Sequence, residues 1–148
     1  MLPRTSLLAL AALSLASSVV VAQEKTARHK VAVQVNQNDP KLMNLALNNV
    51  QNVFAYYKKK GETVAVELVA YGPGLHIFRD DTSPVKERLS KMALEEPSLK
   101  FSACANTLAK QTAAAKKEIK LVSEATLVPS GVITLIELQE KGYSYIRP

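Results

Sequence analysis

Hydrophobic positions follow two alternating periods along most of this chain. Short apolar runs rich in β-branched residues are typical of strands, and between them apolar residues recur about every 3.6 positions, as in amphipathic helices. The predicted strands are residues 31–35, 63–70, 99–103, 119–122 and 143–146. Because each gap holds one helix, the pattern predicts a three-layer α/β/α fold with a five-stranded, mainly parallel sheet and helices on both faces.

The helix predicted after the first strand has clear signals at both ends. Asp39 is a suitable N-cap and Pro40 suits the first helical position. The run Lys58 to Lys60 followed by Gly61 is a typical helix end, where cations complement the helix dipole. We interpret these lysines as a solvated helix end rather than a nucleic-acid site, since no basic stripe accompanies them.

Apolar residues outside the predicted strands suggest two contacts. The helix that begins after Pro129 is expected to carry Val132, Leu135, Ile136 and Gln139 on one side. In the segment after the second strand, Leu75, Ile77 and Phe78 are candidates for an oligomer contact.

The first 22 residues resemble an export signal rather than part of the fold. Arg4 precedes an apolar run that ends in small residues before Gln23, which is the three-part pattern of a secretory signal peptide. The alternative is an uncleaved membrane anchor, but the run is shorter than the roughly 20 residues that a span requires. We therefore expect a cleaved signal peptide over 1–22, a loose leader over 23–29, and a single domain over 30–148 in a periplasmic or secreted protein without a stable membrane anchor.

Composition narrows the chemistry. The chain has 148 residues, a formal net charge of +6, one Cys, two His and no Trp. A single Cys excludes an intramolecular disulfide framework and a multi-thiolate zinc site, and two His make an all-histidine metal site improbable. We expect no metal, no cofactor and no nucleic-acid partner, because aromatic stacking platforms are missing and the charge is modest.

The carboxyl ends of parallel strands form the edge where ligands bind in open α/β sheets. In this chain that edge is expected to gather residues 36–39, 71–76, 104–107 and 123–130. Cys104 is the strongest candidate, because a thiol where a strand gives way to a helix has its anion stabilised by free N–H groups, so that it can act as a nucleophile or persulfide carrier. The alternative is a small, buried, inert side chain.

The same edge supplies the candidate ligand-binding residues. Each has a simpler explanation as well: glycines allow turns with positive φ, a lone loop histidine is commonly just solvated, and Asn or Thr can cap a helix. The candidates are Asn38, Tyr71, Gly72, Gly74, His76, Asn106 and Thr107.

Several of these motifs occur together in a known family. They are residues 38–40 with 44–49, Tyr71-Gly72-Pro73-Gly74-Leu75, Cys104-Ala105-Asn106-Thr107, Pro129-Ser130-Gly131-Val132, and residues 142–148. In this order they resemble the DsrE/DsrF-like family, and most closely its exported bacterial branch. The resemblance implies a parallel α/β/α fold, homo-oligomers that are trimers or hexamers, and a cysteine that carries persulfide sulfur, here Cys104. Ala105 and Tyr71 stand where this branch commonly has glycine and histidine.

Two hypotheses follow for function. In the first, Cys104 accepts and passes on sulfane sulfur or reacts with small thiols, with a sulfur-donor protein or a small sulfur compound as partner. In the second, the chain is a non-catalytic oligomeric binding or assembly module and Cys104 is only packed. A disulfide between two chains through Cys104 is a third, weaker alternative.

Overall fold

The computed structural model describes residues 27–148, and the predicted signal peptide lies outside the described residues. The helices and strands alternate along the chain, as the sequence predicts. They are β1 (His29–Val35), α1 (Pro40–Lys59), β2 (Val64–Ala70), the 3-10 helix η1 (Gly72–Phe78), α2 (Lys86–Glu95), β3 (Leu99–Cys104), α3 (Ala105–Ala115), β4 (Ala125–Val128), α4 (Gly131–Glu140) and β5 (Ser144–Ile146). The five strands form one all-parallel sheet in the order β4-β3-β2-β1-β5, which confirms the predicted fold class.

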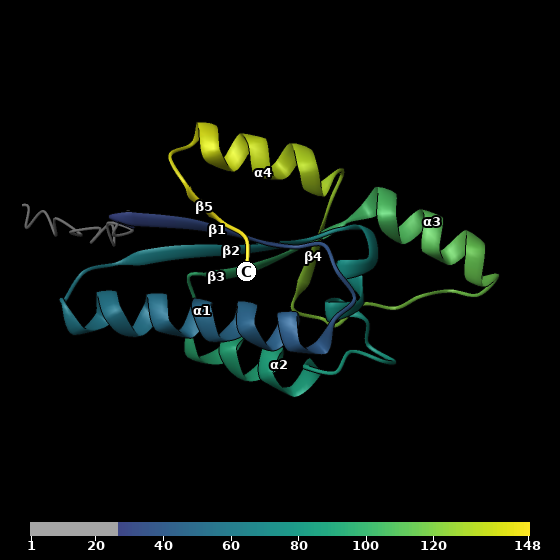
Figure 1. The fold of residues 1–148 in the computed structure, drawn as a ribbon, viewed down its shortest axis with the longest axis horizontal. Coiled ribbons are helices and arrows are strands. Elements are labelled where there is room, and N and C mark those ends of the chain that lie inside the picture. The colour runs from purple at the N-terminus through teal and green to yellow at the C-terminus, as the bar shows by residue number, and fades with distance from the viewer. Residues whose placement is uncertain (1–26) are drawn as a thin grey trace, which may run out of the picture.

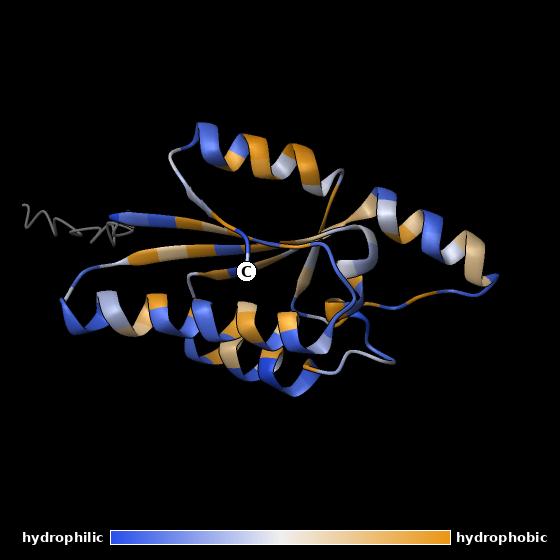
Figure 2. Ribbon diagram, viewed as in Figure 1, coloured by the Kyte–Doolittle hydropathy of each residue, from blue (hydrophilic) through white to orange (hydrophobic). Residues whose placement is uncertain are grey.

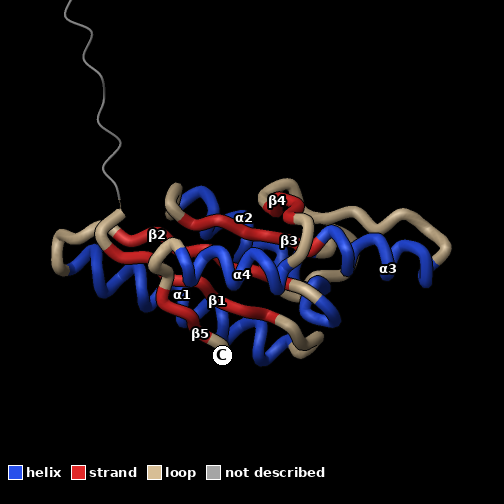
Figure 3. The backbone as a smooth tube through the Cα atoms, turned by 90° about the horizontal axis from the view of Figure 1, so that it is seen from above, coloured by secondary structure: helices blue, strands red, loops and turns tan. Residues whose placement is uncertain are grey.

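The helices divide between the two faces of the sheet (Figure 1). The chain steps from β1 to β2 to β3 in one direction, and right-handed crossovers therefore place α1 and α2 on the same face. From β4 the chain returns across the whole sheet to β5, so that α4 covers the opposite face. Helix α3 follows neither face closely: it projects beyond the carboxyl edge of the sheet in both orthogonal views (Figure 3), and none of its residues is buried.

Both ends of α1 are confirmed. The Asp39 side chain accepts a hydrogen bond of 2.8 Å from the Lys41 N–H, and Pro40 opens the first turn. Lys58 and Lys59 lie in the last turn, and Gly61 follows with a φ of +68°. The lysine run thus forms a helix end, as expected.

The prediction of a fourth strand at residues 119–122 is wrong. Residues 119–122 are not part of the sheet: the Val122 N–H donates to the Phe78 carbonyl at 2.9 Å, and Leu121 forms an isolated antiparallel bridge with Arg79. The actual strand is Ala125–Val128, which pairs with β3. The apolar run misled the prediction because Ile119 and Val122 are buried, but against η1 and the core rather than as a strand.

The larger core lies between the sheet and the helices α1 and α2. It includes Leu75, Ile77 and Phe78, all fully buried, so the prediction that these residues form an oligomer contact is wrong. The apolar side chains of η1 pack into the core of the same chain.

α1 and α2 are also joined by a polar contact. The Arg88 guanidinium of α2 donates to the side-chain oxygens of Asn44 at 2.6 Å, of Asn48 at 2.9 Å and of Gln51 at 2.9 Å. Two asparagines of the 44–49 motif therefore hold the helices together.

α4 turns a different side to the sheet than its sequence suggested. Gly131, Leu135 and Leu138 are its buried residues, whereas Val132, Ile136 and Gln139 are exposed. Figure 2 shows how hydrophobic this helix is, which explains the wrong assignment: apolar residues occur on both its sides.

The predicted leader lies partly outside the described residues, and its last residues are ordered. The Arg28 N–H donates to the Thr63 hydroxyl at 3.1 Å, and His29, where β1 begins, contacts Glu62 at 2.8 Å. Over residues 27–148, no helix combines the length and apolar character needed to cross a membrane.

Candidate functional site

Cys104 ends β3 and is the N-cap residue of α3, as the sequence predicted. Side chains alternate along β3: Phe101 and Ala103 face the large core, so Ser102 and Cys104 face the side that α4 covers. The residue is only 4% exposed. That burial disfavours a disulfide to a second chain, which would need the sulfur at the surface.

Hydrogen-bond donors from two helices face the sulfur. Burial by itself raises the pKa of the Cys104 thiol, but the Thr107 hydroxyl and the backbone N–H groups of Gly131, Thr107 and Asn106 outweigh it, so the pKa lies below its usual value. Asn106 and Thr107 belong to the first turn of α3, and Gly131 begins α4. The sulfur thus lies at two helix N-termini, and a thiolate is the form they stabilise.

Thr107 and Gln111 hold the turn that precedes η1. The Gly72 N–H donates to the Thr107 hydroxyl at 3.0 Å, and the Gln111 side-chain amide donates to the Gly72 carbonyl at 3.1 Å. Thr107 and Gln111 are one helical turn apart on α3, so both backbone groups of Gly72 are bound by one helix face. Because the Thr107 hydroxyl accepts from Gly72, its own proton is free for Cys104.

Tyr71 directly follows β2 and lies beside Cys104, the last residue of β3. Ala70 pairs with Ala103 across β2 and β3, and the next residue of each chain is Tyr71 and Cys104. The Tyr71 hydroxyl accepts a hydrogen bond of 2.5 Å from the Gln34 amide, while Gln34 in turn accepts one from the Tyr145 hydroxyl. This network joins β1 and β5 to Tyr71, the residue beside Cys104.

Three glycines shape the site, one through its backbone conformation and two through the close approach of chain segments. Gly72 has a φ of +53°, a conformation that favours glycine. A side chain at Gly74 would meet the Val35 carbonyl oxygen at 2.4 Å, so Gly74 lets η1 pack on the end of β1. Gly131 has a similar role, since a Cβ there would lie 2.9 Å from Tyr71 Cβ. Gly72 and Gly74 therefore shape the site through their backbones.

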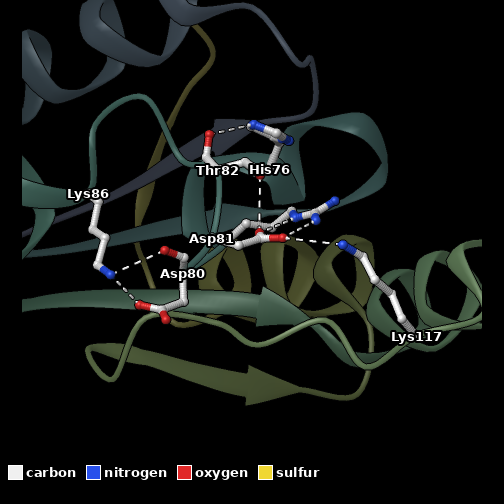
Figure 4. Close-up of polar contacts among 7 residues, drawn as sticks. His76, Asp80, Asp81, Thr82, Lys86 and Lys117 are labelled. Atoms are coloured by element: carbon white, nitrogen blue, oxygen red, sulfur yellow. Dashed lines mark hydrogen bonds and ion pairs between the residues drawn. The ribbon is translucent and has the colours of Figure 1, made fainter.

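Asn38 and His76 lie together, but in a different place. Both line an open cavity of about 410 Å³ between η1 and α3, and Cys104 is not among its lining residues. His76 is half-buried and its Nε2 lies 2.9 Å from the Thr82 carbonyl (Figure 4). A carbonyl only accepts, so Nε2 carries the proton in this contact. We call this cavity the Asn38 pocket.

Sequence reasoning missed three residues that organise the site: Gln34, Gln111 and Gly131. Gln34 lies in a predicted buried strand, and a polar residue in such a strand indicates a buried hydrogen-bond partner. Gly131 occurs in the sequence within a turn motif that does not indicate a contact with the thiol. Gln111 lies in an Ala- and Lys-rich helix, where no neighbouring residue marks it as part of a site. Within residues 27–148 no group of three or more His, Cys, Asp or Glu side chains is placed to hold a metal ion.

Fold and site together define a class: a parallel α/β protein with a lone cysteine held at helix N-termini on the carboxyl edge of its sheet. The chain matches the DsrE/DsrF-like family over residues 8–148, and it belongs to this family. Among curated proteins, none matches it. Among solved structures, it is similar to a protein of unknown function from Methanobacterium thermoautotrophicum, with 30% identity and a TM-score of 0.69 over 81% of this chain and 99% of that chain.

Proposed function

We propose that this protein handles sulfane sulfur or small thiols, with Cys104 as the carrier. The observation that carries the proposal is the position of the Cys104 thiol at the N-termini of α3 and α4, whose hydrogen-bond donors lower its pKa. A thiolate, rather than a thiol, is the form that attacks sulfur. Membership of the DsrE/DsrF-like family fits this role, because the resemblance of the motifs implies a cysteine that carries persulfide sulfur.

The step is a simple displacement at sulfur. The Cys104 thiolate attacks the outer sulfur of a polysulfide or of thiosulfate, an S–S bond forms on Cys104, and the donor's own S–S bond breaks. The electron pair leaves with the shortened polysulfide or with sulfite, so no oxidant is needed. The product is a Cys104 persulfide anion, which the same N–H groups and the Thr107 hydroxyl are placed to stabilise. Because Cys104 is only 4% exposed as a residue, small donors fit this route best.

Mass spectrometry after polysulfide treatment tests the proposal. The native protein should gain the mass of added sulfur, and the Cys104→Ser variant should not. Thiol titration gives a second measurement, since native Cys104 should react rapidly near neutral pH. No adduct, together with a thiol that reacts only after denaturation, would overturn the carrier role.

We also propose that the chain forms homo-oligomers through the outer side of α4. Val132, Ile133 and Ile136 are 48%, 52% and 47% exposed and lie within five residues of one another on this helix (Figure 2). Clustered apolar residues on a surface are typical of protein interfaces. α4 also supplies the Gly131 N–H to the sulfur, so a second copy docked on α4 would lie beside the thiol. This arrangement favours the alternative function, an assembly module, as much as it favours a carrier.

Light scattering distinguishes the proposed α4 contact from nonspecific association through other exposed apolar residues. Ile133→Asp should lower the mass of the oligomer, whereas Leu94→Asp should not, because Leu94 is 85% exposed but lies on α2 at the opposite face of the sheet. An Ile133→Asp variant with unchanged mass would exclude the α4 contact.

Export is the third part of the proposal. An apolar run that ends in small residues before Gln23 supports removal of residues 1–22 and a periplasmic or secreted protein. N-terminal sequencing of the native protein should begin at Gln23, and an intact Met1 would contradict cleavage.

A further inference from the structure

The Asn38 pocket has the features of a small-ligand site. Its volume of about 410 Å³ falls within the range of ligand pockets, and its wall combines apolar side chains with a few polar ones. Pro73, Ala114, Ala115 and Ile119 form the apolar part, whereas Asn38, His76, Arg79 and Gln111 contribute the polar groups. None of the lining residues is acidic.

Charged side chains beside the pocket are paired with one another. Arg79 donates to Asp81 through Nε at 2.9 Å and Nη2 at 2.7 Å, and Lys117 approaches the same carboxylate at 4.0 Å (Figure 4). Two cations therefore share one anion. Asp80 does not supply a second one, because it is paired with Lys86 at 2.5 Å.

Arg79 also retains a donor. Its two hydrogen bonds to Asp81 use Nε and Nη2, and Nη1 has no acceptor among residues 27–148. The Arg79 side chain is only 18% exposed, so a hydrogen bond at this position would be partly shielded from water. Guanidinium groups of this kind bind carboxylates and sulfur or phosphorus oxyanions through paired N–H groups.

The last turn of α3 forms another part of the wall. Ala114 and Ala115 belong to the last turn of α3, whose free carbonyls carry partial negative charge. An anionic group is therefore favoured at the Arg79 guanidinium and disfavoured at the free α3 carbonyls, beside which the alanine methyl groups suit an apolar part of the ligand.

We propose that the Asn38 pocket binds a small anion, a carboxylate or a sulfur oxyanion, with its charged group on Arg79. This site is separate from Cys104, so its occupancy does not depend on sulfur transfer. Its polar wall includes Gln111, which also holds Gly72 beside the thiol.

Titration of the full-length Cys104→Ser protein tests the site without any thiol chemistry. Thiosulfate, sulfate and propionate are added at constant ionic strength with chloride as the baseline, and amide NMR shifts of His76 and Gln111 are followed. At least one probe should give a saturable shift. Sulfate and thiosulfate binding without propionate identifies a sulfur-oxyanion site, and propionate binding identifies a carboxylate site.

Variants of residues in and beside the pocket wall show whether positive charge is responsible for anion binding. Arg79→Gln should weaken binding about tenfold, and Lys117→Gln should weaken it two- to threefold. Should Arg79→Gln not fold, Ala114→Asp provides the same test, because it adds a carboxylate to the wall at an exposed helix position. Ala113→Asp is its matched control: the neighbouring residue is also exposed but does not line the pocket.

Two results would overturn the proposal. One is the absence of a saturable shift with all three anions. The other is equal affinity in Ala114→Asp and Ala113→Asp, which would show that the anion does not bind in this pocket.

Discussion

The two faces of the sheet are built differently. The face under α1 and α2 holds one large apolar cluster that includes Leu47, Leu68 and Phe78, all without measurable exposure. On the face under α4, the cluster of buried apolar residues has four members within residues 27–148, and the buried polar side chains of Gln34 and Ser102 lie on the same face. One face therefore supplies most of the packing, and the other holds polar groups in a partly covered layer.

The polar face is the one that carries the candidate chemistry. Ser102 donates to Glu67 at 2.6 Å, Gln34 bonds two tyrosines, and the Cys104 sulfur lies on the same side. A thiolate needs hydrogen-bond donors and some polarity around it, which a tightly packed aliphatic core would not provide. The difference between the faces thus separates stability from reactivity within one small domain.

The largest expected effect is on stability, and it compares the faces directly. Leu68→Ala removes a fully buried side chain from the α1 and α2 face and should lower the free energy of unfolding by about 3 kcal/mol. Leu138→Ala, on the α4 face at 6% exposure, should lower it by about 2 kcal/mol, because the thinner layer can relax around the cavity. Urea unfolding with a constant slope measures both. An equal or larger loss for Leu138→Ala would contradict the division between the faces.

The sequence predicted the well-packed face better than the polar one. The strands β1, β2 and β3 have alternating or continuous apolar residues, and Asp39, Pro40 and Gly61 fix the ends of α1. These local signals agree with the packing. The prediction of a strand at residues 119–122 is wrong because contacts with η1 bury this apolar run without pairing it in the sheet. The actual strand β4 is half-exposed, so its sequence is less typical of a buried strand.

The candidate site was predicted in part for the same physical reason. Cys104, Thr107 and Gly72 were found because the carboxyl edge of a parallel sheet is fixed by the fold class. Asn38 and His76 follow the same rule yet face another cavity, since strand order and helix direction decide which loops meet. No pattern in the sequence gives those two properties.

The second prediction concerns the thiol itself. Thr107→Val keeps the shape but removes the hydroxyl that lowers the pKa of Cys104, so the pKa should rise and less thiolate should be present near neutral pH. The rate of alkylation by iodoacetamide should fall about tenfold at pH 7, and the midpoint of its pH profile should move upward. Thr107→Ser retains the hydroxyl and is the matched control, with a rate close to that of the native protein. A Thr107→Val profile that overlays the native one would show that the backbone N–H groups alone set the pKa.

The smallest expected effect tests whether α3 acts on the thiol through the turn at Gly72. Gln111 does not touch the sulfur, but it holds the Gly72 carbonyl, and Gly72 in turn donates to the hydroxyl that faces Cys104. Gln111→Ala should weaken this series of hydrogen bonds and slow alkylation of Cys104 by about two- to threefold, with a small upward move of the midpoint of the pH profile.

A double variant tests whether Gln111 acts through Thr107. In the Thr107→Val background Gln111→Ala should have no further effect, because the hydrogen bond to the sulfur is already removed. Additive effects in the double variant would mean that Gln111 influences Cys104 by another route, and the polar face would then act as separate contacts rather than as one network.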